Sequence, residues 1–342
     1  MIKTYQPPHS LTTAILRLSS AISEAVGRLS VLEDEKNLRL RRANRIRTIQ
    51  GSLAIEGNTL SEEQITAILE GKRVLAPPKE IQEVRNAIKA YEQFETWYAT
   101  SEKDLLKAHE ILMTGLVDDA GSYRKGNVDV MNGDQVVHMA PPANRVKHWM
   151  GDLLGWLVDT EEHPLIASSV FHYEFEFIHP FSDGNGRMGR LWQTLILNQW
   201  NPLFANLPVE SMVHQHQSEY YQAINLSTKK TDSAPFIEFM LQMILNTIES
   251  STPQVAPQVT PQVSGLLIAF KGDMSRDELQ TALGLQDRKS FRERYLKPAL
   301  NAGFIEMTIP EKPNSRWQKY RLTDKGRELN PNRHKPQSTF YN

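Results

Sequence analysis

The sequence contains no cysteine. Disulfide bonds, thiolate nucleophiles and zinc sites with cysteine ligands are therefore excluded. No apolar run approaches the roughly 20 residues that a membrane-spanning helix needs, and residues 1–10 lack the pattern of a signal peptide. We therefore expect a cytoplasmic protein with no membrane partner. The formal net charge of -1 gives the chain no overall attraction to nucleic acid.

Composition changes sharply toward the C-terminus. Three four-residue repeats ending in Pro-Gln-Val fill residues 252–263, and such a Pro-rich spacer is expected to be extended and not helical. From residue 265 onward there are 15 Lys or Arg and 9 Asp or Glu, which gives +6 and leaves -7 for the rest of the chain. At 342 residues the chain is long enough for a large core and a second domain. We expect an N-terminal helical region over 1–100, a core over 101–250, a linker over 251–264, a basic domain over 265–330 and a tail over 331–342.

The most informative stretch is residues 179–190, HPFSDGNGRMGR. Residues 165–178 are rich in apolar and aromatic residues, and residues 186–200 carry Leu191, Leu195 and Ile196 at helical spacing, so the stretch is expected to connect two helices. The Gly-Asn-Gly sequence at 184–186 lies where the second helix begins. Glycines there can turn several N–H groups inward, and a helix N-terminus carries about half a positive charge. The loop therefore predicts an anion-binding site.

The side chains around this turn suit a polyphosphate. Arg187 and Arg190 lie three residues apart and can both reach phosphate oxygens. Asp183 would repel a phosphate directly but could hold a magnesium ion that bridges the phosphates. An imidazole with an ordinary pKa of about 6.5 is mostly neutral at cell pH, so His179 could accept a proton from a hydroxyl nucleophile. Each residue alone has an ordinary structural explanation, but none of these explanations predicts the combination.

The loop resembles the signature of Fic (filamentation-induced-by-cAMP) proteins, His-Pro-Phe-x-Asp/Glu-Gly-Asn-Gly-Arg-x-x-Arg, at every fixed position from His179 to Arg190. The resemblance implies a helical fold and transfer of AMP from ATP to a Ser, Thr or Tyr hydroxyl of a target protein, with release of pyrophosphate. His179 would deprotonate that hydroxyl, Asp183 would hold Mg²⁺ and Phe181 would anchor the loop. The ATP phosphates would be bound by Gly184, Asn185, Gly186, Arg187 and Arg190.

A second constellation lies far upstream. Few helix-breaking residues occur over about 37–57, which predicts a helix that stops at Gly57 and places Glu56 in its last turn. A carboxylate there faces the negative end of the helix dipole and would benefit from a cationic partner. The segment resembles the inhibitory Ser/Thr-x-x-x-Glu-Gly/Asn motif of class II Fic proteins, with Ser52 and Glu56 at its fixed positions. This resemblance implies that Glu56 pairs with Arg190 and keeps the γ-phosphate from docking. In some Fic proteins the same glutamate also positions water for removing AMP from the target.

Residues 127–139 predict a β-hairpin that turns at Asn132-Gly133. A hairpin in a helical protein has an edge that can accept a strand from another chain, although residue propensities alone favour a structural flap that covers part of the core. In Fic proteins, a hairpin between a Gly-x-Tyr-Arg segment, here 121–124, and a Pro-Pro segment, here 141–142, is a target-docking flap. The residues assigned to docking are Val128, Val130, Val136 and Val137.

Two aromatic residues, Tyr220 and Tyr221, begin a helix expected over 217–228. Paired aromatics often follow the core in Fic proteins, so one of them is a candidate for the adenine pocket. Aromatic residues at such spacing are also common in protein cores.

The basic C-terminal region predicts a winged helix. A capping box at Ser275 opens a helix ending near Gly284, a second helix runs from Asp287 to about Lys297-Pro298, and strands are expected over 304–308 and 317–322. Basic residues on the second helix permit DNA contact. Winged helices also bind proteins, and the sequence does not decide between these partners.

Three functions remain open at this level. The first is an autoinhibited AMP-transferase using ATP and Mg²⁺, with self-modification as one outcome and a homodimer as a possible assembly. The second keeps the fold but transfers phosphate, phosphocholine or UMP, and the complete loop favours AMP over these. The third is a regulator whose nucleotide-loaded core controls DNA binding through Arg288 and Arg292.

Overall fold

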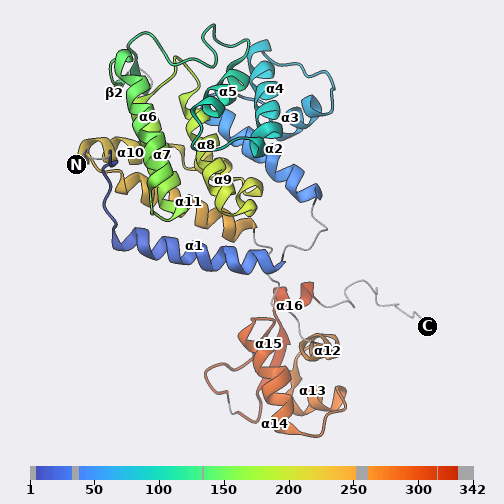
Figure 1. Cartoon of the computed structure of the whole chain (residues 1–342). Coiled ribbons are helices and arrows are strands. Elements are labelled where there is room, and N and C mark those ends of the chain that lie inside the picture. The colour runs from blue at the N-terminus through green and yellow to red at the C-terminus, as the bar shows by residue number, and fades with distance from the viewer. Residues whose placement is uncertain (1–4, 33–37, 133–134, 252–260, 314, 330–342) are drawn as a thin grey trace. The chain divides into compact units, whose positions relative to one another are not determined.

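The computed structural model describes residues 5–32, 38–132, 135–251, 261–313 and 315–329. In these ranges the protein is mainly helical with two small sheets, which confirms the predicted fold class. The chain divides into two compact units, Met1–Thr252 and Pro253–Asn342, whose elements Figure 1 labels. In the described ranges no helix combines the length and apolarity that crossing a bilayer requires.

The first unit is a helical bundle with one hairpin. Its helices are α1 (Thr13–Leu32), α2 (Leu38–Ile55), α3 (Glu62–Leu69), α4 (Pro78–Gln93), α5 (Glu102–Met113), α6 (Ala143–Asp159), α7 (Pro164–Ile178), α8 (Asn185–Trp200), α9 (Val209–Gln215), α10 (Gln217–Lys230) and α11 (Ala234–Ser251). Short 3-10 turns occupy Phe94–Thr96 and Pro202–Asn206.

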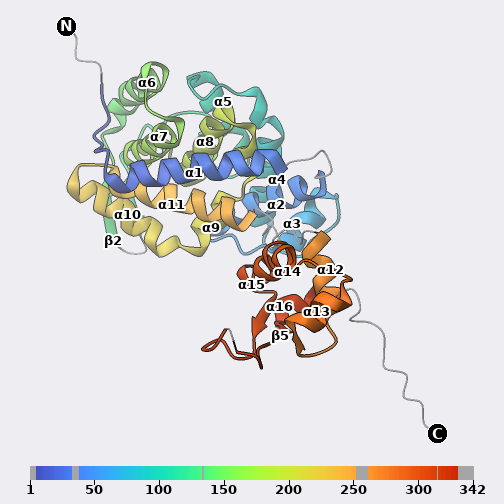
Figure 2. The same ribbon diagram turned by 90° about the horizontal axis from the view of Figure 1, so that it is seen from below.

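The core of this unit is built around α7 and α8, which pack against each other along their length. Nearly every residue of α7 is buried, which explains why its apolar residues are spread around the helix and not confined to one stripe. Helix α1 packs along α11, and α2 packs against α9; Figure 2 shows α1 running beside α11. The loop between α7 and α8 is therefore held between two buried helices.

The predicted hairpin is present as β1 (Asp129–Asn132) and β2 (Gln135–Met139). Asn132 pairs with Gln135 as a strand residue, whereas the sequence assigned it to the turn, and Gly133 of the predicted turn lies outside the described residues. Val130 pairs with His138 and Met131 with Val136, so the register shifts and Val137 is the extra residue of a bulge. The side chains of residues 129–139 lie outside the described set, so their assignment to docking stays a prediction.

The second unit contains α12 (Pro261–Ala269), β3 (Met274–Ser275), α13 (Arg276–Ala282), α14 (Arg288–Phe291), α15 (Lys297–Asn301), β4 (Ile305–Met307), β5 (Lys319–Leu322) and α16 (Asp324–Glu328). The strands form a sheet in the order β3-β5-β4. Residues Arg292–Leu296 form a π-turn between α14 and α15. A separate apolar cluster that includes Leu266, Phe291 and Tyr320 forms its core.

Two sequence expectations for this unit were wrong. Residues 261–263 were assigned to an extended linker but open α12, because a proline in the first turn of a helix lacks only an N–H that would have no intrahelical partner. The second basic helix was expected to stop at Lys297-Pro298 but continues to Asn301. The π-turn just before Pro298 shifts the local hydrogen-bond pattern, which accommodates a residue without an N–H.

Candidate active site

The C-terminus of α7 aims the side chain of His179. This residue has φ 50° and ψ 63°, in the left-handed region, where a residue other than glycine is uncommon and costs about 1 kcal/mol or more. The turn is held by Arg124, which is 3% exposed. Its Nε donates to the His179 carbonyl at 2.7 Å, and its backbone N–H donates to the Pro180 carbonyl at 2.9 Å. Tertiary contacts therefore fix the direction in which the imidazole leaves the helix.

Arg124 also joins this turn to the hairpin. Its Nη1 donates to the carbonyl of Gly126 at 2.8 Å, and its Nη2 donates to the carbonyl of Pro141 at 2.5 Å. Gly126 precedes β1 and Pro141 follows β2, so one guanidinium holds both ends of the hairpin against the loop. The sequence did not predict this role for Arg124, which only marked the segment before the hairpin. A buried arginine that binds backbone carbonyls has no recognisable sequence pattern.

Phe181 anchors the loop with a buried ring, as the resemblance to Fic proteins implied. Its ring is fully buried and stacks on His109, with ring centroids 3.6 Å apart and planes at 4°. His109 Nδ1 accepts from the Gly121 N–H at 2.9 Å, so Nε2 carries the hydrogen and donates to the Asp183 carbonyl at 3.0 Å. Burial lowers the pKa of His109 and keeps it neutral. His109 was not predicted, since a single histidine in a helix gives no functional signal.

Asn185 closes the loop with its side chain. Its Oδ1 accepts from the Phe181 N–H and its Nδ2 donates to the Phe181 carbonyl, both at 2.9 Å. The expected phosphate contact by Asn185 would therefore fall to its backbone N–H at the start of α8. Gly184 has φ 85°, and a Cβ there would lie only 2.6 Å from Met113 Sδ. The first glycine of the turn is thus required by both backbone conformation and space.

Glu56 lies directly at this helix N-terminus. Helix α2 ends at Ile55, so Glu56 follows the helix and is not in its last turn as expected. Its Oε1 accepts from Arg190 Nη2 at 2.7 Å, while Ser52 accepts from the same guanidinium through its carbonyl at 2.9 Å and its Oγ at 3.2 Å. A Cβ on Gly186 would overlap the Glu56 carboxylate. The Glu56 carboxylate therefore occupies the position at which the loop is predicted to bind an anion.

Arg190 is 2% exposed, and burial and nearby charges shift its pKa in opposite directions. Burial is the largest single effect and lowers its pKa, but Glu56, Tyr220 and Glu176 together outweigh burial, and the pKa of Arg190 lies above its ordinary value. Arg190 is thus charged, and its Nε and Nη2 are bound by Ser52 and Glu56.

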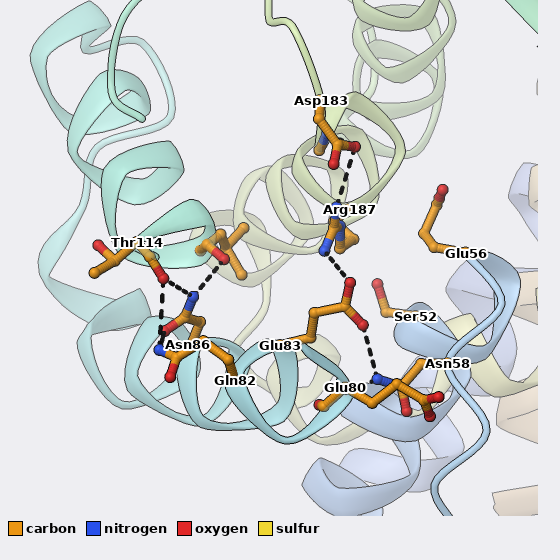
Figure 3. Close-up of polar contacts among 12 residues, drawn as sticks. Ser52, Glu56, Asn58, Glu80, Gln82, Glu83, Asn86, Thr114, Asp183 and Arg187 are labelled. Carbon is orange, nitrogen blue, oxygen red and sulfur yellow. Dashed lines mark hydrogen bonds and ion pairs between the residues drawn. The ribbon is translucent and has the colours of Figure 1, made fainter. Parts of the chain in front are cut away.

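The other loop arginine, Arg187, lies between two carboxylates (Figure 3). Its Nη2 is 3.2 Å from Asp183 Oδ1 and its Nη1 is 3.4 Å from Glu83 Oε1. The side chain of Asp183 is 48% exposed, whereas those of Arg187 and Glu83 are 6% and 11% exposed. Glu83, on α4, was not predicted, because it looks like a polar-face residue of an amphipathic helix.

Behind Arg190 lies a buried polar group that includes one of the two candidate adenine residues. Tyr220 is 2% exposed, and its hydroxyl lies 3.1 Å from His172 Nε2, so the proposal that Tyr220 faces a nucleotide is wrong. His172 Nδ1 lies 2.6 Å from Gln193 Oε1, and burial lowers the pKa of His172 to about 3. Tyr221 is partly exposed and remains a candidate. The fold separates two residues that are equivalent in the sequence.

Glu176 completes this buried group and gives a test of it. Its Oε1 makes no hydrogen bond within the described part of the chain. Burial raises its pKa to about 8, Arg190 opposes this and Glu56 adds to it. Because the ordinary value is 4.5, the folded protein keeps a proton that the unfolded chain releases. Stability should therefore fall as pH rises from about 4.5 through about 8.

The Glu176→Gln variant should lose this pH dependence. The rise in pKa from 4.5 to about 8 spans more than three units, each worth about 1.4 kcal/mol, so the melting temperature of the variant should exceed that of the wild type by on the order of 10 °C at pH 8 and match it at acidic pH. Scanning calorimetry across this range provides the measurement. Glu161→Gln, which changes an exposed carboxylate, is the control and should leave the wild-type slope intact. Parallel slopes for Glu176→Gln and wild type would contradict a protonated Glu176.

Comparison with known proteins places this site in a family. The model of the Fic/DOC family matches residues 99–197, and that of the filamentation induced by cAMP protein Fic-like C-terminal domain matches residues 261–323. The crystal structure of a Fic family protein from Desulfovibrio desulfuricans G20 is 53% identical with a TM-score of 0.71, and the match covers 94% of this chain and 99% of that one. The chain therefore belongs to the Fic family.

Curated relatives are more distant. Protein adenylyltransferase Fic of Aedes aegypti is 29% identical over 231 residues, which is 63% of this chain and 44% of the relative. The protein of the same name from Nematostella vectensis is 30% identical over 214 residues, 59% of this chain and 47% of the relative. The chain thus spans less than half the length of these two relatives. Fic-1 (residues 134–508) of C. elegans, at 24% identity, shares the fold with a TM-score of 0.57 over 69% of this chain and 70% of that one.

Proposed function

We propose that this protein is an autoinhibited protein adenylyltransferase that transfers AMP from ATP to a hydroxyl side chain of a target protein. The observation that carries the proposal is the position of the Glu56 carboxylate, which lies against Gly186 and binds Arg190 at 2.7 Å. An anion at the N-terminus of α8, bound by a buried arginine, supports a site built for phosphate. The curated relatives named protein adenylyltransferase support the same reaction.

Different residues of the loop perform different parts of the reaction. The target hydroxyl oxygen attacks the α-phosphorus of ATP, the bond from that phosphorus to the bridging oxygen breaks, and pyrophosphate leaves. His179 accepts the hydroxyl proton. Arg187, Arg190 and the N–H groups at the start of α8 neutralise the phosphate charge, so the protein acts mainly by positioning and electrostatic stabilisation. Tyr221 is the aromatic residue proposed to border the adenine.

Asp183 is the proposed magnesium ligand. Its carboxylate is half exposed and faces Arg187 with one oxygen. No cluster of three potential acidic or histidine ligands exists among the described residues. One carboxylate fits Mg²⁺ in a nucleotide site, because this ion usually takes its other ligands from phosphates and water. Bound there, the ion would neutralise charge on the phosphates.

Glu56 supplies the inhibition. While its carboxylate holds Arg190, a γ-phosphate meets a negative charge at the position where it needs a positive one. ATP can then bind only with its phosphates displaced from Arg190. Removal of the Glu56 carboxylate would open this position.

The hairpin between β1 and β2 is the proposed target-docking flap. Arg124 ties both of its ends to the loop that carries His179. A target segment that adds a strand to the flap edge would therefore be registered relative to the imidazole.

The second unit is proposed to be a winged helix. Helices α12, α13 and α14–α15 and the strand order β3-β5-β4 support this assignment. Arg288 and Arg292, near the start of the second basic helix, are exposed, so the unit can present positive charge to a partner. DNA and protein both remain candidate partners for it.

Labelled ATP tests the chemistry. The full chain carrying Glu56→Gly, incubated with cell lysate, should transfer label from α-labelled ATP to protein, including itself, and none from γ-labelled ATP. The control is the same variant with His179→Asn, which should transfer neither label. Label that arrives only from the γ-position would indicate phosphate transfer, and no label from either position would contradict nucleotide transfer altogether.

A further inference from the structure

Glu83 is a buried carboxylate that none of the proposed roles uses. Its Oε1 lies 3.4 Å from Arg187 Nη1, and its Oε2 accepts from Asn58 Nδ2 at 2.8 Å. Asn58 is two residues beyond Glu56. Figure 3 shows this carboxylate between the loop arginine and the turn that follows α2. One side chain thus contacts both the phosphate-binding loop and the inhibitory segment.

Helix α4 holds Glu83 in a fixed place. Asn86, one turn further along, donates to the Leu112 carbonyl at 3.0 Å and to the Thr114 carbonyl at 2.8 Å at the end of α5. Gln82 donates to the Asn86 side chain at 2.8 Å. Helix α4 is therefore anchored to the end of α5 through a side chain one turn from Glu83, as Figure 3 shows, and the Glu83 carboxylate does not need to move to meet Arg187.

The two carboxylates around Arg187 differ in how readily they can release it. Asp183 is half exposed, so water can replace the guanidinium at little cost. Glu83 is 11% exposed, and loss of its cation would leave a largely buried charge with the Asn58 amide as its remaining partner, which is unfavourable. When a nucleotide binds, Asp183 should therefore give up Arg187 and Glu83 should keep it.

We propose that Glu83 is the positioning residue of Arg187. It holds one side of the guanidinium while the β-phosphate binds the other side. The same carboxylate also contacts the inhibitory turn through Asn58. This inference rests on the proposed binding of ATP by the loop. Glu83 touches no nucleotide itself. Its effect should therefore depend on the phosphate that Arg187 contacts and not on the adenosine.

Nucleotide binding provides the test, without any need for AMP transfer. In the Glu56→Gly protein, where the site is open, calorimetry should show that Glu83→Gln weakens ATP and ADP about tenfold or more, the usual effect of losing a hydrogen bond to a charged group. Affinity for AMP, which has no β-phosphate, should stay the same. Equal weakening of all three nucleotides, or unchanged affinity for ATP, would overturn the proposal.

Glu80→Gln is the matched control. Glu80 lies on the same helix, and its carboxylate accepts from the Thr59 N–H at 2.7 Å and the Thr59 hydroxyl at 2.8 Å, so it holds the same turn. Within the described part of the chain, no hydrogen bond or ion pair joins Glu80 to Arg187. Its replacement should leave the affinities for ATP and ADP unchanged.

A double-mutant cycle covers the case in which Glu83→Gln alone folds poorly. Removing both charges leaves no unpaired partner, so the protein with Arg187→Gln and Glu83→Gln should fold. It should bind ATP as weakly as Arg187→Gln alone, because Glu83 acts only through Arg187. A further tenfold loss in the double variant would refute the proposed route. If neither the variants nor the Glu56→Gly parent bound ATP, the proposed function, and not the role of Glu83, would be wrong.

Discussion

Glu56→Gly is expected to raise the rate of AMP transfer at least tenfold. The variant removes the carboxylate that binds Arg190 at 2.7 Å and leaves both hydrogen bonds from Arg190 to Ser52 in place. A hydrogen bond between charged groups contributes about 1.5–3 kcal/mol, and about 1.4 kcal/mol corresponds to a factor of ten in rate or population. Initial rates with α-labelled ATP, measured for both proteins at equal concentration, provide the comparison.

Two control variants separate charge from shape. Glu56→Gln keeps the size of the side chain and an oxygen acceptor but not the charge, so it should be activated less than Glu56→Gly. Glu62→Gln changes an exposed carboxylate in the first turn of α3 that pairs only loosely with Arg47, at 3.6 Å. It should leave the rate unchanged. If Glu56→Gly and wild type transferred AMP equally while His179→Ala did not, the chemistry would stand and the autoinhibition would be wrong.

The loop was predictable from sequence because its chemistry is contiguous. Residues 179–190 contain the imidazole, the carboxylate, the glycine turn and both arginines within twelve positions, and helix periodicity on either side places the turn at a helix N-terminus. The contact between Glu56 and Arg190, 134 residues apart, could not be obtained from spacing. It followed from the resemblance to the inhibitory motif.

The supporting residues were not predictable, for a physical reason. Arg124, His109 and Glu83 act through partners that only the packed fold supplies: backbone carbonyls, an aromatic ring and another segment's arginine. Their own neighbourhoods in the sequence look like an ordinary loop and two amphipathic helices. Nothing in a local pattern distinguishes Glu83, which faces the loop, from the solvent-exposed Glu92 of the same helix.

Burial explains the remaining differences. Tyr220 and Tyr221 are adjacent and chemically identical, but successive helical residues point about 100° apart. The first therefore enters the core beside His172 and the second stays near the surface. The linker ends earlier than expected for a different reason. The prediction used the helix-breaking effect that proline has inside a helix, but proline is tolerated in the first turn of a helix, where Pro261 lies.

His179→Asn and His179→Ala are both expected to lower AMP transfer by a factor of about 10²–10⁴, the range for loss of a general base. The backbone makes this pair of variants informative. His179 has a positive φ of 50°, a conformation that asparagine adopts readily and alanine does not. Asn therefore removes the base and keeps the turn, whereas Ala removes the base and strains the turn.

The comparison decides between chemistry and structure. If His179 is the base, both variants in the Glu56→Gly protein should lose activity to a similar extent and still bind ATP with unchanged affinity, because the phosphate-binding groups lie on α8. His148→Ala, which removes an exposed histidine on α6, should leave the rate unchanged. Recovery of most of the activity in His179→Asn would show that the turn, and not the imidazole, is what the reaction needs. In that case the proton would have to be accepted by another group.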